Sequence, residues 1–216
     1  MHGNPPKAIY QTPLGISERL VILLDKTIPY IPVVMRRDSG HSLPVCPLPE
    51  GFQYQKYQPG FEKDWARIEA SVDEFECEMD ALIHFQKSFM PYSTELPRRC
   101  FFVATAEGKR IGTATAWWDY VGQRRYPLIH WVAVKPDFQG KGLGKALIAE
   151  VLRLMTTIDG DGIFYLRTST YSHKAIQLYE RVGFYLVKEK EVFGRPNAQY
   201  EEAVALLQTL RENMHP

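Results

Sequence analysis

Residues 132–147, VAVKPDFQGKGLGKAL, are the most informative stretch of the sequence. An apolar run ends at Pro136, and glycines at the alternate positions 140, 142 and 144 then lead into a helical pattern. Glycines let the backbone approach a ligand closely and aim successive N–H groups at one point. A helix start adds unpaired N–H donors and the positive end of its dipole. The stretch therefore predicts an anion seat suited to a pyrophosphate.

A glycine-rich turn can also do no more than close a corner between a strand and a helix. Two known nucleotide-binding patterns do not fit this one. No Gly-Lys-Ser/Thr closes the run, and its spacing is GxGxG rather than GxGxxG, without an acidic residue at a strand end about 20 residues further on.

Working outward from this turn, apolar periodicity predicts strands and helices along most of the chain. Strands are expected at residues 52–58, 100–106, 110–119, 126–134, 163–168 and 184–189. Helices are expected as a pair within residues 61–90 and at 142–156, 172–182 and 198–212. This order predicts a mixed sheet with helices on both faces.

The first 50 residues form a separate compositional region. Residues 38–51 carry three prolines and two glycines, which is typical of an irregular connector. Before it, residues 17–26 predict a short helix capped by Ser17, and residues 31–36 predict a short strand. We interpret residues 1–50 as an arm packed on a main domain that spans residues 51–216.

Composition and charge exclude several classes of protein. With 45% hydrophobic and 24% charged residues, the chain has the balance of a soluble globular protein. Its 26 basic and 25 acidic residues are mixed, so no basic stripe indicates nucleic-acid binding. The three cysteines lie far apart, which predicts neither a metal site nor a disulfide framework. No signal peptide or membrane span is recognised, so we expect a cytoplasmic protein.

Two segments resemble the GNAT superfamily of acetyl-coenzyme A-dependent acetyltransferases. The family's phosphate signature, Q/R-x-x-G-x-G/A with an upstream V-x-P, is filled by Gln139, Gly142 and Gly144 after residues 134–136. The segment AIQLYERVGF, residues 175–184, resembles the family's A-x-x-x-Y-x-x-x-G-F helix. The resemblance covers about residues 52–190. It implies an α/β fold whose mixed, mostly antiparallel twisted sheet is flanked by helices.

The resemblance also implies where acetyl-CoA would bind. The strand before the turn would pair its backbone with the pantetheine arm through Val132, Ala133 and Val134, and would splay from the next strand to admit the thioester. Ser172 stands where the family often has an asparagine that contacts this arm, and its reach is shorter. The pyrophosphate would be held by backbone N–H groups of Gln139, Gly140, Lys141, Gly142, Leu143, Gly144 and Lys145.

Two residues are candidates for proton transfer. The resemblance places Tyr179 where it would protonate the departing thiolate, although a buried tyrosine can also only anchor its helix. His130 is the candidate base, because imidazole titrates near neutral pH. It shares strand parity with Val132 and Val134, which predicts one common face. A histidine hydrogen-bonded within the protein is the alternative.

Acidic residues are candidates for holding a cationic acceptor. Glu74 and Glu78 are four residues apart in the helical region before the first hairpin, and this region usually lines the acceptor pocket in the family. Asp119, at the end of a hairpin strand, is a further candidate. A solvated acidic helix face is the alternative explanation for the helical pair.

The family usually closes its sheet with a seventh strand, yet no strand candidate follows residue 193. An unfilled edge would expose unpaired backbone groups. Residues 31–36 are β-prone, so we expect them to add to the sheet or to pack over its C-terminal part. An arm that drapes on the surface or mediates dimer contacts is the alternative.

The function expected from these observations is N-acetyl transfer. The acetyl group would pass from acetyl-CoA to a primary amine of a small molecule or peptide, which attacks the thioester directly. A non-catalytic acyl-CoA-binding regulatory module, or a transferase for another acyl group, is the alternative. We expect no nucleic-acid, membrane or metal partner, and a monomer or homodimer.

Overall fold

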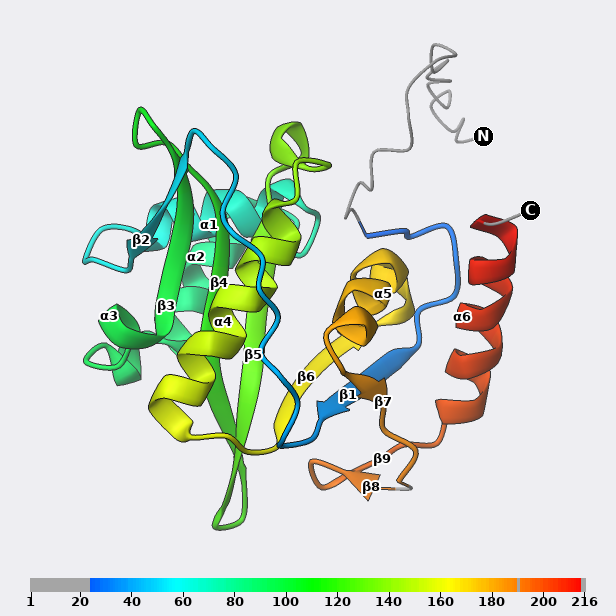
Figure 1. The fold of residues 1–216 in the computed structure, drawn as a ribbon. Coiled ribbons are helices and arrows are strands. Elements are labelled where there is room, and N and C mark those ends of the chain that lie inside the picture. Colours follow the sequence, from blue (N-terminus) through cyan, green and yellow to red (C-terminus); the bar gives the residue numbers. More distant parts are fainter. Residues whose placement is uncertain (1–23, 190, 215–216) are drawn as a thin grey trace, which may run out of the picture.

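A seven-stranded sheet, in the order β2-β3-β4-β5-β6-β1-β7, carries the fold (Figure 1). The computed structural model describes residues 24–189 and 191–214. All neighbouring strands run antiparallel except β5 and β6, which are parallel. The strands are β1 (Pro32–Arg37), β2 (Phe52–Lys56), β3 (Cys100–Thr105), β4 (Arg110–Val121), β5 (Arg124–Val134), β6 (Phe164–Ser169) and β7 (Tyr185–Leu186). The expected mixed, mostly antiparallel sheet is confirmed.

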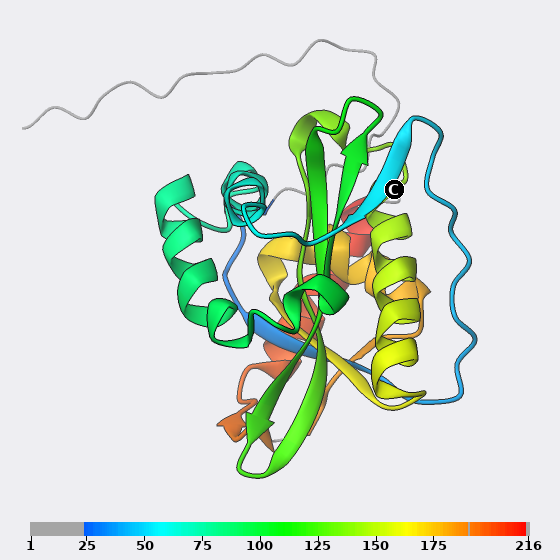
Figure 2. The same ribbon diagram turned by 90° about the vertical axis from the view of Figure 1, so that its left-hand side faces the viewer.

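Helices cover both faces of this sheet (Figures 1 and 2). Helices α1 (Glu62–Ser71) and α2 (Glu78–Ser88) lie on one face, and α4 (Leu143–Asp159) and α5 (His173–Arg181) lie on the other. The last helix, α6 (Tyr200–Met214), packs near β1. The short elements are α3 (Leu96–Arg99), η1 (Met90–Tyr92), η2 (Pro136–Phe138) and η3 (Thr170–Ser172). In the described parts of the chain, no helix is long and apolar enough to cross a bilayer.

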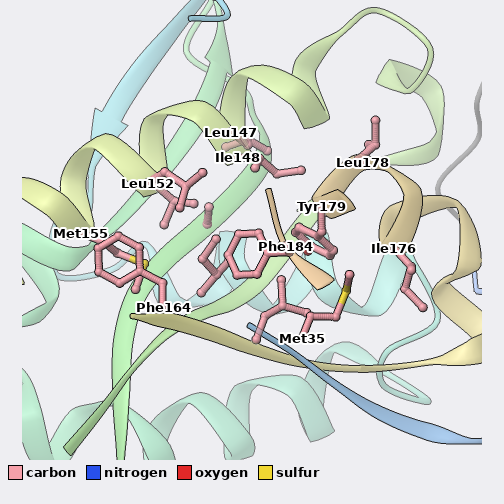
Figure 3. Packing of buried hydrophobic residues seen from close by; sticks show 14 of the residues in the cluster. Met35, Leu147, Ile148, Leu152, Met155, Phe164, Ile176, Leu178, Tyr179 and Phe184 are labelled. Atoms are coloured by element: carbon pink, nitrogen blue, oxygen red, sulfur yellow. The ribbon is translucent and has the colours of Figure 1, made fainter. Parts of the chain in front are cut away.

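Strand β1 lies inside the sheet, between β6 and β7. It pairs antiparallel with β6 over its whole length and with β7 at Met35 and Arg36. Its alternate side chains enter the core, because Val33 is 5% exposed and Met35 is 0% exposed. Figure 3 shows Met35 among the buried side chains contributed by α4 and α5. The expectation that residues 31–36 would join the sheet is thus confirmed, whereas the domain boundary at residue 50 stays a prediction.

The buried guanidinium of Arg37 ties β1 to the loop that follows α5. Its Nε donates to the carbonyl oxygen of Val182 at 2.9 Å, and its Nη2 donates to the carbonyl oxygens of His41 and Ser42, each at 3.0 Å. From there, residues 38–51 run along the outer side of α4 to β2 (Figures 1 and 2). Strand β1 is therefore held next to β6 and the end of α5 by side-chain as well as ladder hydrogen bonds.

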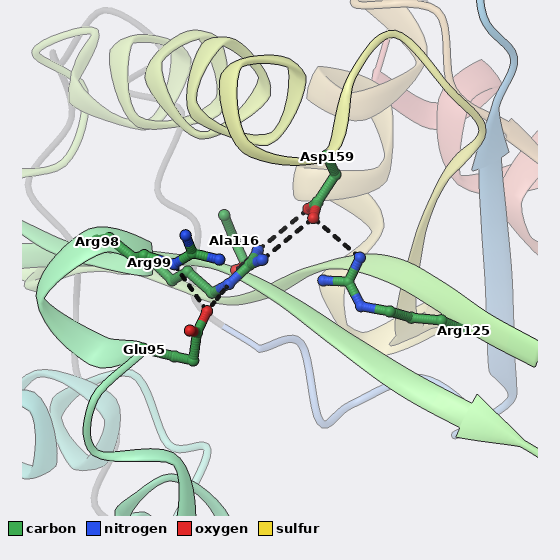
Figure 4. A network of polar contacts seen from close by, with 6 residues as sticks. All are labelled: Glu95, Arg98, Arg99, Ala116, Arg125 and Asp159. Atoms are coloured by element: carbon green, nitrogen blue, oxygen red, sulfur yellow. Dashed lines mark hydrogen bonds and ion pairs between the residues drawn. The ribbon is translucent and has the colours of Figure 1, made fainter.

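A buried network of charged side chains lies at the end of α4 opposite the glycine turn (Figure 4). Arg99, 3% exposed, donates from Nη1 and Nη2 to the carboxylate of Asp159, each at 3.1 Å. Arg125 adds a bond of 2.9 Å to the same carboxylate, and Glu95 accepts from Arg99 Nε at 2.8 Å. The network joins the end of α4 to α3 and β5.

The C-terminal part differs from the expectation in two ways. The strand expected at residues 184–189 is reduced to the two residues of β7. Beyond it, the side-chain amide of Asn197 donates a hydrogen bond to the carbonyl oxygen of Val187 at 2.7 Å, so this oxygen is used outside the strand ladder. A small hairpin of β8 (Glu191–Val192) and β9 (Arg195–Pro196) then stands outside the main sheet. The helix expected at residues 17–26 falls mainly outside the described residues.

Candidate active site

The two parallel strands β5 and β6 separate at the centre of the sheet. They pair only at Leu128 with Tyr165 and at Ile129 with Leu166. A cavity of about 640 Å³ lies where they part, lined by both strands, the start of α4, α5 and α1. It therefore connects the two faces of the sheet through the gap that the resemblance predicts for the thioester.

The glycine turn forms the start of α4 on one side of this gap. Gly140 and Gly142 have φ angles of 75° and 84°, a left-handed conformation that residues with a side chain rarely adopt. The amide of the Gln139 side chain donates to the carbonyl oxygen of Val134 at 2.7 Å and fixes the turn against the end of β5. Because α4 has 17 residues, its first N–H groups carry a full helix dipole.

Lysines surround this helix start. The ammonium groups of Lys109 and Lys141 lie 5.6 and 5.1 Å from the ring centre of Phe138. Burial, together with the nearby Lys109 and Arg67 charges, lowers the pKa of Lys135. Lys145 is exposed on the first turn of α4. The arrangement favours an anion at the turn, since positive charges and unpaired N–H groups converge there.

A bulge in β5 changes the face that His130 was expected to share. Thr113 of β4 pairs with Ala133, and Thr115 pairs with His130. The two β4 residues are two positions apart and their β5 partners are three positions apart, so β5 contains one extra residue here. Trp131, within the bulge, has a φ of 51°. His130 therefore lies on the face of Ala133 and not on that of Val134. The predicted common face of His130, Val132 and Val134 was wrong, because parity holds only in a regular strand.

His130 still lines the cavity, packed against aromatic rings. Its ring centre lies 6.0 Å from Phe89 and 5.2 Å from Trp131. Burial lowers the pKa of His130 to about 3, and the charges of Arg167 and His84 add to the effect. An imidazole with so low a pKa is a weak acceptor for the proton of an ammonium group.

Tyr179 projects from α5 into the cavity. It is 8% exposed, and its ring packs edge-on against Phe184 at 6.0 Å. Burial raises the pKa of Tyr179, and the negative charges of Glu74 and Glu69 raise it further. The phenol therefore keeps its proton at neutral pH and can donate it. Ser172, Val132, Ala133 and Val134 line the same cavity, as does Gly144 from the turn.

The three acidic candidates have different outcomes. Glu74 lines the cavity at its opening, where part of its surface meets solvent while burial of its carboxyl group raises its pKa. Glu78 is 64% exposed, outside the cavity lining, with its carboxylate 3.6 Å from Arg67 Nε. Asp119 is also outside the lining, but its carboxylate lies 3.0 Å from Nη1 of Arg167, which does line the cavity.

Sequence reasoning missed Glu69. It stands on α1, is 1% exposed and lines the cavity. Its Oε1 is enclosed and has no hydrogen-bond partner among the described residues. Burial raises the pKa of Glu69 well above its usual range, and the charge of Glu74 adds to this. The signal was present, because Glu69 shares an apolar helix face with Trp65, Ile68 and Val72.

A family model described as the acetyltransferase (GNAT) family matches residues 61–184, from α1 to the end of α5. The chain belongs to the GNAT family. The glycine turn, the sheet gap and helix α5 all fall inside the segment that the GNAT family model matches.

Curated relatives agree with this GNAT assignment. A mycothiol acetyltransferase of Streptomyces coelicolor is 28% identical over 149 residues, covering 68% of this chain and 47% of the relative. An uncharacterised N-acetyltransferase of Methanocaldococcus jannaschii is 35% identical over 95 residues, covering 43% of this chain and 40% of the relative. The chain spans about half the length of the curated relatives it matches.

Solved structures show the same fold. A GCN5-related N-acetyltransferase from Sphaerobacter thermophilus superposes with a TM-score of 0.56 at 20% identity, covering 73% of this chain and 50% of that one. A fungal GCN5-related glucosamine N-acetyltransferase region superposes with a TM-score of 0.51 at 12% identity, covering 74% and 20%. At these identities the likeness concerns the GNAT fold alone.

Proposed function

We propose that this protein is an N-acetyltransferase that moves the acetyl group of acetyl-CoA onto a primary amine of a small molecule or peptide. The observation that carries the proposal is one continuous cavity at the gap between β5 and β6. It joins the start of α4, on one side of the sheet, to Tyr179 and to the carboxylates of α1 and its following loop.

The α4 side of the cavity suits the cofactor. Backbone N–H groups from Gln139 to Lys145 would hold the pyrophosphate at the helix start. The end of β5 is free of β6 beyond Ile129, so Val132 to Val134 can offer backbone groups to the pantetheine arm. Ser172, half-buried on the opposite wall, can donate a hydrogen bond to the same arm.

Within the gap, Tyr179 supports group transfer rather than binding alone. Acetyl-CoA supplies an activated thioester, and a thiolate that leaves it needs a proton or a hydrogen bond at neutral pH. Tyr179 is buried, protonated and lines the gap. A phenol there would donate its proton to the sulfur as the bond to the acetyl carbon breaks.

The opposite side of the cavity suits the acceptor. Glu69 and Glu74 contribute carboxyl groups, while Trp131, Tyr30 and Tyr171 contribute aromatic side chains to the wall. Four relatives are named mycothiol acetyltransferases, which supports a small-molecule acceptor for this chain as well. A cationic amine with an apolar body fits both kinds of wall.

Calorimetry with acetyl-CoA, followed by a thiol-release assay over a panel of primary amines, tests the proposal. We expect saturable binding of acetyl-CoA and amine-dependent release of CoA thiol. Binding with no turnover on any amine would favour a non-catalytic acyl-CoA-binding module. Faster turnover of a longer acyl-CoA than of acetyl-CoA would assign a different acyl group.

A further inference from the structure

The cavity contains a buried carboxyl group, that of Glu69, with one oxygen unpaired within the described chain. Glu69 is 1% exposed, and its Oε1 meets no hydrogen-bond donor among the described residues. An isolated carboxylate in such a place lowers the stability of a protein unless a partner arrives. Its neighbours on the same helix face, Trp65, Ile68 and Val72, are apolar. The position therefore calls for a cationic or hydrogen-bonding ligand.

The surroundings of Glu69 contain acids and neutral groups in place of a counter-ion. Glu74 at the opening, Cys100 on β3 and Tyr179 on α5 lie within electrostatic reach of its carboxylate. The positive charge of Lys26 opposes the rise in the pKa of Glu74. The Lys26 ammonium group donates a hydrogen bond to the carbonyl oxygen of Asp73 at 3.0 Å. The cavity's arginines, Arg167 and Arg195, and its histidine, His130, are other charged or titratable groups on its wall. Arg167 pairs with Asp119 at 3.0 Å instead, and Oε1 of Glu69 has no hydrogen-bond partner within residues 24–189 and 191–214.

We propose that Glu69 is the acceptor-side base, which receives the ammonium group of the substrate amine and takes its proton, with Glu74 drawing the cation in at the opening. This inference rests on the proposed N-acetyltransferase function and assigns its acceptor class: an amine that is cationic at neutral pH. Helix α1 thereby supplies the base, across the cavity from the acid on α5.

The transfer balances with the groups present. The ammonium gives one proton to the Glu69 carboxylate, and the nitrogen lone pair then forms the new C–N bond at the thioester carbonyl carbon. The C–S bond breaks with its electron pair on sulfur, and the sulfur takes the proton of the Tyr179 hydroxyl. The second proton lost by nitrogen restores Tyr179, and Glu69 releases its proton to solvent. The net products are the amide, CoA thiol and one proton.

A raised pKa makes the ionised carboxylate of Glu69 a stronger proton acceptor than that of an exposed glutamate. Burial raises the pKa of Glu69 well above that of an exposed glutamate, in contrast to His130 at about 3. Only the ionised carboxylate accepts a proton. Activity should therefore fall as the pH drops through this raised pKa.

The test compares Glu69→Gln with Glu69→Asp and with the control Glu76→Gln. Glu76 is an exposed acid of the same region that does not line the cavity. The probes are 2-phenylethylamine, putrescine and glucosamine, with saturating acetyl-CoA and CoA thiol release as the readout. We expect kcat/KM of Glu69→Gln to fall by about 10²–10⁴-fold at neutral pH. Glu69→Asp should keep part of the activity, and Glu76→Gln all of it.

Three readouts separate a base from a merely structural residue. Acetyl-CoA affinity in Glu69→Gln should equal that of the wild type, and its melting temperature should be equal or higher, because a costly buried carboxylate is removed. Its rate should climb steadily with pH as free amine accumulates, while the wild type levels off. Wild-type turnover in Glu69→Gln would overturn the role of Glu69 and leave the transferase function standing. A wild type that acetylates none of the probes would overturn both.

Discussion

Replacing Met35 by alanine tests whether the N-terminal arm is part of the folded core. Met35 is 0% exposed at the middle of β1, opposite Leu166 of β6 and Leu186 of β7. The substitution leaves every ladder hydrogen bond in place and empties a space within the main core. Truncating a buried methionine to alanine costs about 2–5 kcal/mol of unfolding free energy. In a chain of this size the melting temperature should fall by roughly 4–20 °C.

Thermal and urea denaturation followed by circular dichroism measure this loss. The matched control is Val45→Ala, since Val45 is 96% exposed in the connector after β1, and we expect a change within about 0.5 kcal/mol. Deleting residues 1–40 removes β1 altogether and should abolish cooperative unfolding. A Met35→Ala protein that melts within about 1 °C of the wild type would show that β1 carries little of the stability, and the reasoning would fail.

Three further predictions concern the cofactor seat, the acid and the buried charge network. Gly142→Glu should weaken acetyl-CoA binding by about 10²-fold or more, because it places a negative charge at the anion seat and a side chain at a φ of 84°. Unchanged affinity by calorimetry in the folded variant would show that the pyrophosphate does not bind at this turn. Tyr179→Phe should lower turnover by about 10²–10⁴-fold with little change in acetyl-CoA affinity, and a wild-type rate would reduce Tyr179 to a packing role. Asp159→Asn should cost about 3–5 kcal/mol in urea denaturation, because it leaves the buried guanidinium of Arg99 without its counter-charge. Burial raises the pKa of Asp159, but hydrogen bonds from Arg99 and Arg125 outweigh it and hold the pKa low. The stability that Asp159 contributes should therefore be present at neutral pH and be lost as the pH falls through this lowered pKa. If the unfolding free energy of Asp159→Asn depended on pH as that of the wild type does, this role of Asp159 would be wrong.

Local signals predicted the parts of the fold that depend on local chemistry. The glycines at 140 and 142 predicted a turn, which the structure forms with left-handed backbone, and the apolar period after it predicted α4. The strand in the arm was also predictable, because residues 31–36 are β-prone and no strand candidate closed the sheet. Its slot between β6 and β7 was not, since strand order depends on long-range packing that no short window contains.

The site was predicted in part, for a physical reason. The turn at residues 139–145 could be predicted because a phosphate seat needs a recognisable run of glycines before a helix, and its role in binding stays a prediction. The face of His130 was missed because one extra residue at the bulge reverses strand parity, and Trp131 at a φ of 51° carries no sequence mark of this. Glu69 was overlooked although it interrupts the apolar face of α1. A charged residue at such a position is a signal that sequence reasoning can use.

The stoichiometry of transfer from acetyl-CoA tests the central claim most directly. Incubating the wild-type protein with acetyl-CoA and 2-phenylethylamine, putrescine or glucosamine, and measuring CoA thiol and N-acetylated amine together by mass spectrometry, follows both products of one reaction. One acetylated amine should form for each thiol released, and both products should be lost in Gly142→Glu. Thiol release without any acetylated amine, or no binding of acetyl-CoA at all, would contradict the claim.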